Sequence, residues 1–272
     1  MKRFLSMLLM VSAGCGFVLS CGKSAPTVVE KTDKPAQFTF LTPQELHLRL
    51  LIENVGDVRI KGSMPDTTVF QVHREAVAAG RTRASELMDR IAMVPTMEKD
   101  GMVKFQPKYP GIKSGEKVFT HVDVLVPLNQ RISISLAVTG GNFEAAGLNA
   151  DLTLKTVGKN QVTLQAFQGL VNLDLDSGEA VVGMTLEGGK IHMKDGRIII
   201  KQRMKEPMND LVVELDSGEV IVEVIQGFTG RIRLEAPEVK NTTPFKLAPS
   251  SEGKGILVKV KKGSAHLRSE LF

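Results

Sequence analysis

The sequence predicts a mainly β fold, organised as a solenoid-like stack of strand-turn-strand repeats of about twenty residues, with one short helix in an N-terminal insert. Three observations predict it. Apolar and polar residues alternate along most of the chain after residue 45, which is the pattern of half-buried strands. The sequence Leu175–Glu179 recurs as Leu215–Glu219, forty residues later, and glycine or asparagine markers recur about every twenty residues.

The first twenty residues have the pattern of an export signal. Met1–Arg3 is a short basic start, residues 4–19 form an uncharged apolar run, and Ser20 precedes Cys21. A cysteine directly after the cut is typical of a bacterial lipoprotein, so we expect a signal peptide over residues 1–20 and lipid on Cys21. Two or three acyl chains, at about 0.8 kcal/mol per buried methylene, would hold the chain firmly to a membrane.

Other interpretations of this segment stay open. The protein could be secreted without lipid, or the segment could be an uncleaved membrane anchor, although its apolar run of 16 residues is shorter than the roughly 20 that a spanning helix needs. Cys15 offers a rival cut, which would leave a short apolar core. Gly22 is not the aspartate that often retains lipoproteins at an inner membrane, which favours the outer membrane in a cell that has two.

Cleavage before Cys21 would leave 252 of the 272 residues. Cys21 would then be the sole cysteine, which excludes a disulfide framework, a cysteine metal site and a thiol nucleophile. The net charge of +5 falls to +3 when Lys2 and Arg3 are removed. Nucleic acid binding needs a concentrated basic face, so we expect no nucleic acid partner.

The remainder is expected to be a tether followed by one domain. Residues 21–37 are polar, with Pro26 and Pro35, and are typical of a flexible tether. Residues 38–272 then form a single β-repeat domain.

The first part of that domain is predicted to hold strands and the helix. Leu46, Leu48 and Leu50 begin a strand pair over residues 45–61, broken at Gly56. The further strands are expected at residues 69–73, 102–105, 117–126 and 131–138. Helical spacing of Leu87, Met88 and Ile91 predicts a short helix near residues 82–91.

The repeats are predicted to stack from about residue 132 to 236, followed by a C-terminal cap with strands at 256–260 and 265–268. One unit cannot bury its apolar face alone, so neighbouring units must pair in register about 4.8 Å apart. The repeat turns are expected at Gly158, Gly178, Gly196 and Gly218, with Asp176 and Asp216 beginning turns. An antiparallel meander is the alternative.

Charges support the stacked arrangement. When the units are aligned on the turn glycine, the next residue is Lys159, Glu179, Arg197 and then Glu219. Opposite charges on adjacent strands stabilise a sheet by about 0.2–1 kcal/mol. We therefore expect Arg197 to lie beside Glu179.

Two segments resemble a known family. Asn54–Gly62 is similar to the opening of the bacterial putative-adhesin β-repeat domain, and the helix-bearing insert, Val122–Pro127 and the glycine-turned repeats follow in the same order. The resemblance covers about residues 45–270 and departs at Val239–Gly255, where a loop replaces a clean repeat. It implies a solenoid-like β fold and an adhesin role, and it brings no catalytic residues.

Candidate catalytic and metal sites are few. The histidines, which show neither HxH nor HxxxH spacing, are His47, His73, His121, His192 and His266. We therefore expect no metal and no cofactor. Asp176, Glu179, Asp216 and Glu219 are the best candidates for a calcium ladder or an acid/base pair, but aspartate and serine also begin turns, which is the interpretation we favour. Absence of Trp and a single Tyr argue against a dedicated carbohydrate module.

The sequence therefore favours a non-catalytic envelope protein that presents a strand-built surface for binding or scaffolding. Its partners would be the membrane, through Cys21, and an unknown protein or surface ligand. A polysaccharide-active β-helix enzyme and an accessory or sensor lipoprotein in envelope stress are the alternatives.

Overall fold

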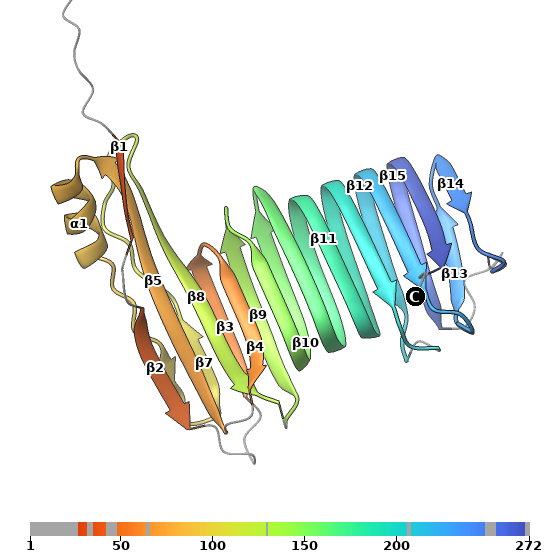
Figure 1. Cartoon of the computed structure of the whole chain (residues 1–272), viewed down its shortest axis with the longest axis horizontal. Coiled ribbons are helices and arrows are strands. Elements are labelled where there is room, and N and C mark those ends of the chain that lie inside the picture. The colour runs from red at the N-terminus through yellow and green to blue at the C-terminus, as the bar shows by residue number, and fades with distance from the viewer. Residues whose placement is uncertain are drawn as a thin grey trace, which may run out of the picture.

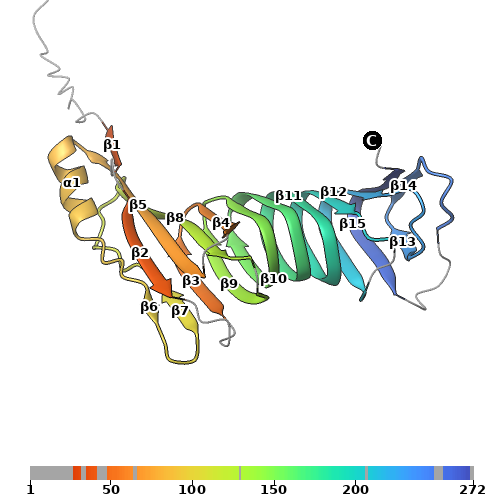
Figure 2. The same ribbon diagram turned by 60° about the horizontal axis from the view of Figure 1, so that its bottom comes forward.

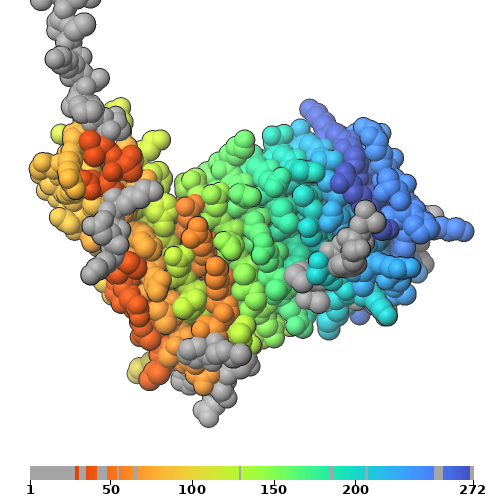
Figure 3. All heavy atoms as spheres, in the orientation of Figure 1, coloured from red at the N-terminus to blue at the C-terminus, as the bar shows by residue number. Residues whose placement is uncertain are grey.

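The computed structural model describes residues 27–31, 35–41, 48–63, 66–128, 130–205, 208–247 and 254–269. In these ranges the protein is mainly β, with one helix and one large sheet of 15 strands. Seen from two directions, the strands lie side by side along the long axis (Figures 1 and 2). Figure 3 shows the red to yellow residues of the N-terminal part at one end of this axis and the blue residues of the last strands at the other.

The N-terminal part is antiparallel around the strand β5, Thr67–Ala79. The strands β1, Thr27–Lys31, and β2, Ala36–Leu41, both pair with β5 on one side, and β8, Lys117–Pro127, pairs with it on the other. Both β1 and β2 include residues of the 21–37 segment in which a flexible tether was expected. Backbone pairing with β5 therefore extends the folded part to Thr27.

The helix α1 lies at Arg81–Asp89, close to the prediction. It buries Leu87 and Met88 against Ala76 and Ala78 of β5. Beside it, β6, Thr96–Met97, and β7, Met102–Phe105, form a small hairpin that Figure 2 shows below α1.

The middle of the sheet is parallel. The strands β3, Arg49–Val55, and β4, Val58–Ser63, precede β5 in the chain. However, β4 pairs with β8 and with β10, Phe143–Val157, while β9, Ile132–Thr139, pairs with β3 and β10. Long connections thus bring distant segments together, with Val58 between Val122 and Phe143.

Beyond β10, successive segments pair in parallel and in register. The 44-residue strand β11, Lys159–Gln202, follows β10, with Phe143 opposite Val162. It is followed by β12, Leu211–Val224, with Gly196 opposite Gly218. We define these segments together with β15 as the parallel stack. The pairing offsets are 19 residues between β10 and β11 and 22 between β11 and β12, close to the predicted twenty, whereas the offset between β12 and β15 is 45.

The last strands differ from the expected cap. The strand β15 is a single run, Gly255–Ser269, and pairs in parallel with the whole length of β12. It thus adds a layer to the stack, while β13, Arg231–Glu235, and β14, Glu238–Asn241, pair with its other side. Loop residue Phe245 packs near Phe228, with ring centroids 5.6 Å apart, beside this end of the core.

One apolar core runs through both parts. Alternate residues of each strand point inward, as in β9, where every second residue from Ile132 to Val138 is buried. The largest fully buried side chains are aromatic: Phe70, Phe105, Phe143 and Phe167. Each contributes about 1.5–3 kcal/mol through burial, so the N-terminal part and the parallel stack share the same source of stability. Among the described residues, no helix has both the length and the apolar character to cross a membrane.

Candidate functional site

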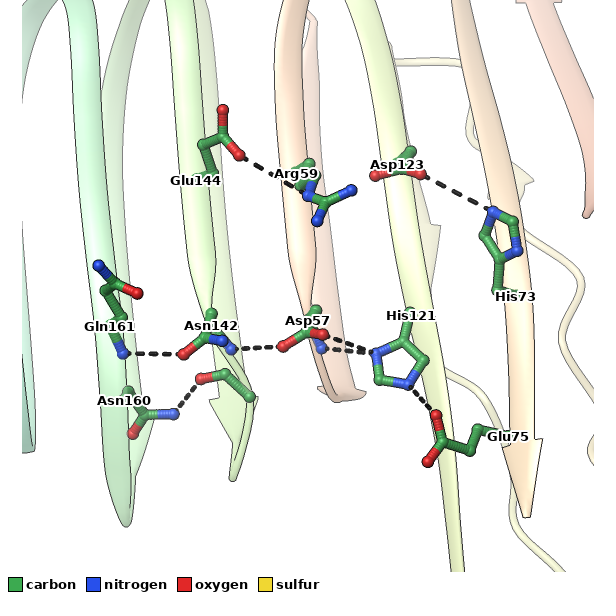
Figure 4. A network of polar contacts seen from close by, with 11 residues as sticks. Asp57, Arg59, His73, Glu75, His121, Asp123, Asn142, Glu144, Asn160 and Gln161 are labelled. Atoms are coloured by element: carbon green, nitrogen blue, oxygen red, sulfur yellow. Dashed lines mark hydrogen bonds and ion pairs between the residues drawn. The ribbon is translucent and has the colours of Figure 1, made fainter. Parts of the chain in front are cut away.

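A row of polar contacts crosses the junction between the N-terminal part and the parallel stack (Figure 4). Nδ1 of His121 accepts the backbone N–H of Asp57 at 3.1 Å. Oδ1 of Asp57 accepts the N–H of Asn142 at 2.8 Å, and Oδ1 of Asn142 accepts the N–H of Gln161 at 3.0 Å. In each step a side chain of one segment accepts a backbone N–H of the segment beside it in the sheet. We call these four residues the junction row.

His121 also lies between two carboxylates. Its Nδ1 is 3.3 Å from Oδ2 of Asp57, and its Nε2 is 3.3 Å from Oε2 of Glu75 on β5. Because Nδ1 accepts a backbone N–H, the neutral ring is assigned its proton on Nε2, which faces Glu75. The imidazole is therefore positioned from both sides.

The junction row borders a hollow of about 520 Å³. Its lining combines four basic, three acidic and three other residues: Arg59, His73, Arg74, His121, Asp57, Glu75, Asp123, Phe119, Gly56 and Gly140. His73 lies 3.8 Å from Asp123, and Arg59 lies 3.6 Å from Glu144 beside the hollow. The acidic and basic groups of the lining thus face one another.

Glycine makes the junction possible. A Cβ on Gly56 would stand 3.2 Å from the His121 ring, and a Cβ on Gly141 would overlap the backbone of Gly56. Asn160 adds a hydrogen bond from its side-chain amide to the carbonyl of Gly141.

A glycine column runs along the parallel stack. A Cβ on Gly178 would overlap the carbonyl of Asn160. In the same way, a Cβ on Gly196 would overlap the carbonyl of Gly178, and a Cβ on Gly218 would overlap the carbonyl of Gly196. Their φ angles of +122°, +137° and +132° lie in the region that favours glycine. Gly158, expected in this series, lies outside the column: Asn160 takes that place, and a Cβ on Gly158 would meet nothing within 4 Å.

The absence of side chains along this column leaves a shallow groove of about 610 Å³. Charged and polar side chains border it, including Lys159, Glu179, Asp195 and Arg197. The expected charge contact is present, because Arg197 lies 3.8 Å from Glu179 and 3.0 Å from Glu219 on the other side.

The two repeat aspartates lie on the same side of the stack and are each held by lysine. Nζ of Lys194 donates to Asp176 at 2.8 Å, and Nζ of Lys261 lies 2.7 Å from Asp216. These lysines are the main cause that lowers the pKa of both carboxyls below the ordinary aspartate range. Asp176 also accepts the backbone N–H of Gly158 at 3.0 Å, 18 residues away, so this carboxylate bonds to the neighbouring segment and not to its own turn.

The remaining predicted residues are placed as follows. Cys21 and His47 lie outside the described residues. His192 lies 3.1 Å from Asp174, and His266 lies 3.5 Å from Glu219, so both rings lie beside carboxylates of the stack. Within the described part of the chain, no group of three or more metal-ligating side chains is close enough to hold a metal ion.

Sequence reasoning missed the junction row. Asp57 and His121 are 64 residues apart, and no local spacing links them. The signal that was available is the pair of glycines, Gly56 and Gly141, each directly before a polar residue at the start of a strand.

No protein-family model and no curated protein matches the chain. Solved structures that resemble it include a "putative adhesin" from Bacteroides fragilis, with 12% identity over 86% of this chain and 98% of that one and a TM-score of 0.39. A "putative cell adhesion protein" from Clostridium sporogenes shares 12% identity over 87% and 100%, with a TM-score of 0.35. A "putative lipid binding protein" from Parabacteroides distasonis shares 12% over 87% and 98%, with a TM-score of 0.37.

The adhesin names agree with the family resemblance of the sequence. Identities and TM-scores this low support no transfer of a ligand or an activity to this chain.

Proposed function

We propose that this protein is an envelope lipoprotein, anchored by lipid on Cys21, whose solenoid-like β stack presents a non-catalytic, adhesin-like surface for binding or scaffolding. The observation that carries the proposal is the pairing of outward charges between neighbouring strands, of which Arg197 between Glu179 and Glu219 is the centre. Such pairing keeps the strands in register and leaves a regular, rigid exterior.

The alternative of a polysaccharide-active enzyme needs an acid/base pair of carboxyls. A hydrolase of that kind keeps one carboxyl protonated through a raised pKa. Asp176 and Asp216 both have a lowered pKa, and each is bound to a lysine. Both are therefore ionised near neutral pH, which favours a structural role for them and a binding role for the stack.

The anchor is tested by metabolic labelling with an alkyne-tagged fatty acid. The wild-type protein and the Cys15→Ser variant should both be labelled and pellet with membranes, whereas the Cys21→Ser variant should be unlabelled. Loss of label in Cys15→Ser with retention in Cys21→Ser would instead support the rival cut.

The binding role is tested with a soluble form that begins at Gly22, so that β1 and β2 are retained. Immobilised protein is exposed to envelope extracts, and the captured material is identified. The matched control is Arg197→Glu, which would place three carboxylates in one column. Capture of a defined protein or glycan, reduced by that variant and without turnover, supports the proposal, whereas turnover of a captured glycan supports the enzyme alternative.

A further inference from the structure

The chain enters the fold at one end of the molecule. The strand β1 begins at Thr27, six residues after Cys21, and pairs Thr27 with Ala79 at the end of β5. Figure 1 shows β1 and α1 at the end opposite to β13 and β14. Six residues reach at most about 20 Å. A lipid on Cys21 would therefore keep the β1 end close to the bilayer.

Five exposed side chains lie near this end: Val29, Arg81, Ile112, Lys113 and Lys117. We call them the end surface. Val29 and Lys117 project from the face of the sheet opposite to α1, whereas Arg81 lies on the α1 side, because it pairs with Glu30. Val77 pairs with Val29 on one side and with Lys117 on the other, so these two lie within two strand spacings, about 10 Å, of each other. Ile112 and Lys113 belong to the loop that leads directly into Lys117, and the backbone N–H of Lys113 donates to Glu116 at 2.8 Å.

The end surface combines apolar and basic character. Val29 and Ile112 are 52% and 51% exposed, a value that large aliphatic residues elsewhere in this fold also reach, such as Val157 at 51%. Arg81 is 83% exposed. An end of the molecule that carries both exposed apolar and exposed basic side chains is suited to rest on a membrane containing anionic lipids.

Three acidic groups nearby pair with arginine, whereas Asp89 at the end of α1 is exposed. Glu30, whose side chain is 17% exposed, pairs with Arg81, and Glu116, whose side chain is 9% exposed, pairs with Arg83 at 2.8 Å. Glu86, on α1, is 51% exposed but also pairs with Arg83. The lysines, in contrast, face solvent.

We propose that the end surface lies against the bilayer, with Ile112 among the lipid headgroups and the basic side chains on anionic phospholipid. The proposal rests on the lipid anchor at Cys21 and adds an orientation to it. The parallel stack then points away from the membrane, and β13 stands about 50 Å further out, because ten strand spacings separate it from β1 when the three stacked layers of β11 are counted.

The test uses the full, processed chain in vesicles of phosphatidylethanolamine and phosphatidylglycerol. Cys15 is removed with the signal and the thiol of Cys21 carries lipid, so an introduced cysteine is the single free thiol. An environment-sensitive dye is attached to Ile112→Cys or to the control Val239→Cys, which lies on β14 and is 41% exposed in the wild type. A quencher attached to the acyl chains should quench the dye at 112 and leave the dye at 239 unaffected.

A second comparison tests the contribution of charge. In vesicles of phosphatidylcholine alone, or in the Lys113→Glu/Lys117→Glu variant, quenching at position 112 should fall to about half or less. The orientation is wrong, and the anchor is unaffected, if vesicle-bound protein shows equal quenching at positions 112 and 239. The same holds if quenching at position 112 is equal in anionic and in neutral vesicles. Protein that fails to float with vesicles overturns both.

Discussion

The Nδ1 atom of His121 accepts a hydrogen bond from the backbone N–H of Asp57 at 3.1 Å, across 64 residues of sequence. This contact joins β8 to the start of β4, where the antiparallel N-terminal part meets the parallel strands. The same ring faces the carboxylates of Asp57 and Glu75. The junction is therefore fixed by one side chain that serves two neighbouring strands.

Replacing His121 by alanine should lower the free energy of unfolding by about 1–2 kcal/mol, since a partly buried N–H loses its acceptor. Urea titration measures the change, and hydrogen exchange should show loss of protection at the Asp57 amide. The control is His73→Ala, which removes an exposed pair 3.8 Å long and should cost less than about 0.5 kcal/mol. Equal costs for the two variants would show that the junction row does not stabilise the fold.

The glycine column gives a sharper prediction. Gly196→Ala should cost about 3 kcal/mol or more, because the new Cβ would overlap the carbonyl of Gly178 and φ is +137°. Gly158→Ala keeps a positive φ of +82° but meets open space, so it should cost about 1–2 kcal/mol. The melting temperatures of the two variants, measured side by side, test this difference. A larger decrease for Gly158→Ala than for Gly196→Ala would favour the register expected from the sequence.

The strands of the stack could be predicted from the sequence because apolar and polar residues alternate along them, and successive residues of a strand point to opposite faces of the sheet. The sequence also placed Arg197 beside Glu179, since residues 18 apart share a position when units repeat. It aligned Gly158 with Gly178, whereas the backbone that Gly178 packs against is that of Asn160, 18 residues earlier.

Other features left no local pattern. Residues 27–31 are few and flanked by proline and lysine, and they become a strand through pairing with β5. Ala76–Ala79 is rich in alanine yet belongs to β5, because it packs between α1 and the neighbouring strands. The contact between His121 and Asp57 depends on the order of strands in the sheet, which alternation does not encode.

Arg131 offers a test of buried charge. It contacts Asp151 and lies 3.0 Å from Glu187, whose side chain is 7% exposed, and the hydrogen bond to Asp151 is the main cause that raises the pKa of Arg131. Arg131→Ala should destabilise the fold by about 2–3 kcal/mol, since a buried carboxylate loses its partner while Arg131 itself is partly exposed. Adding Glu187→Gln should recover part of that loss in chemical denaturation. A double variant that is less stable than Arg131→Ala would contradict this account.

Acid stability should depend on Glu116. Hydrogen bonding to Arg83 is the main cause that lowers the pKa of this carboxyl to about 2, from an ordinary value near 4.5. Because the folded pKa is the lower one, the pair stabilises the fold above pH 4.5, and the contribution is lost as the pH falls from about 4.5 to 2. Melting temperatures measured at pH 7, 4.5, 3 and 2 should therefore fall less steeply below pH 4.5 in Glu116→Gln than in the wild type. Glu98→Gln is the matched control, because its carboxyl pairs with Lys104 at the surface. An unchanged slope in Glu116→Gln would mean that the pair with Arg83 does not stabilise the end of the fold that carries α1.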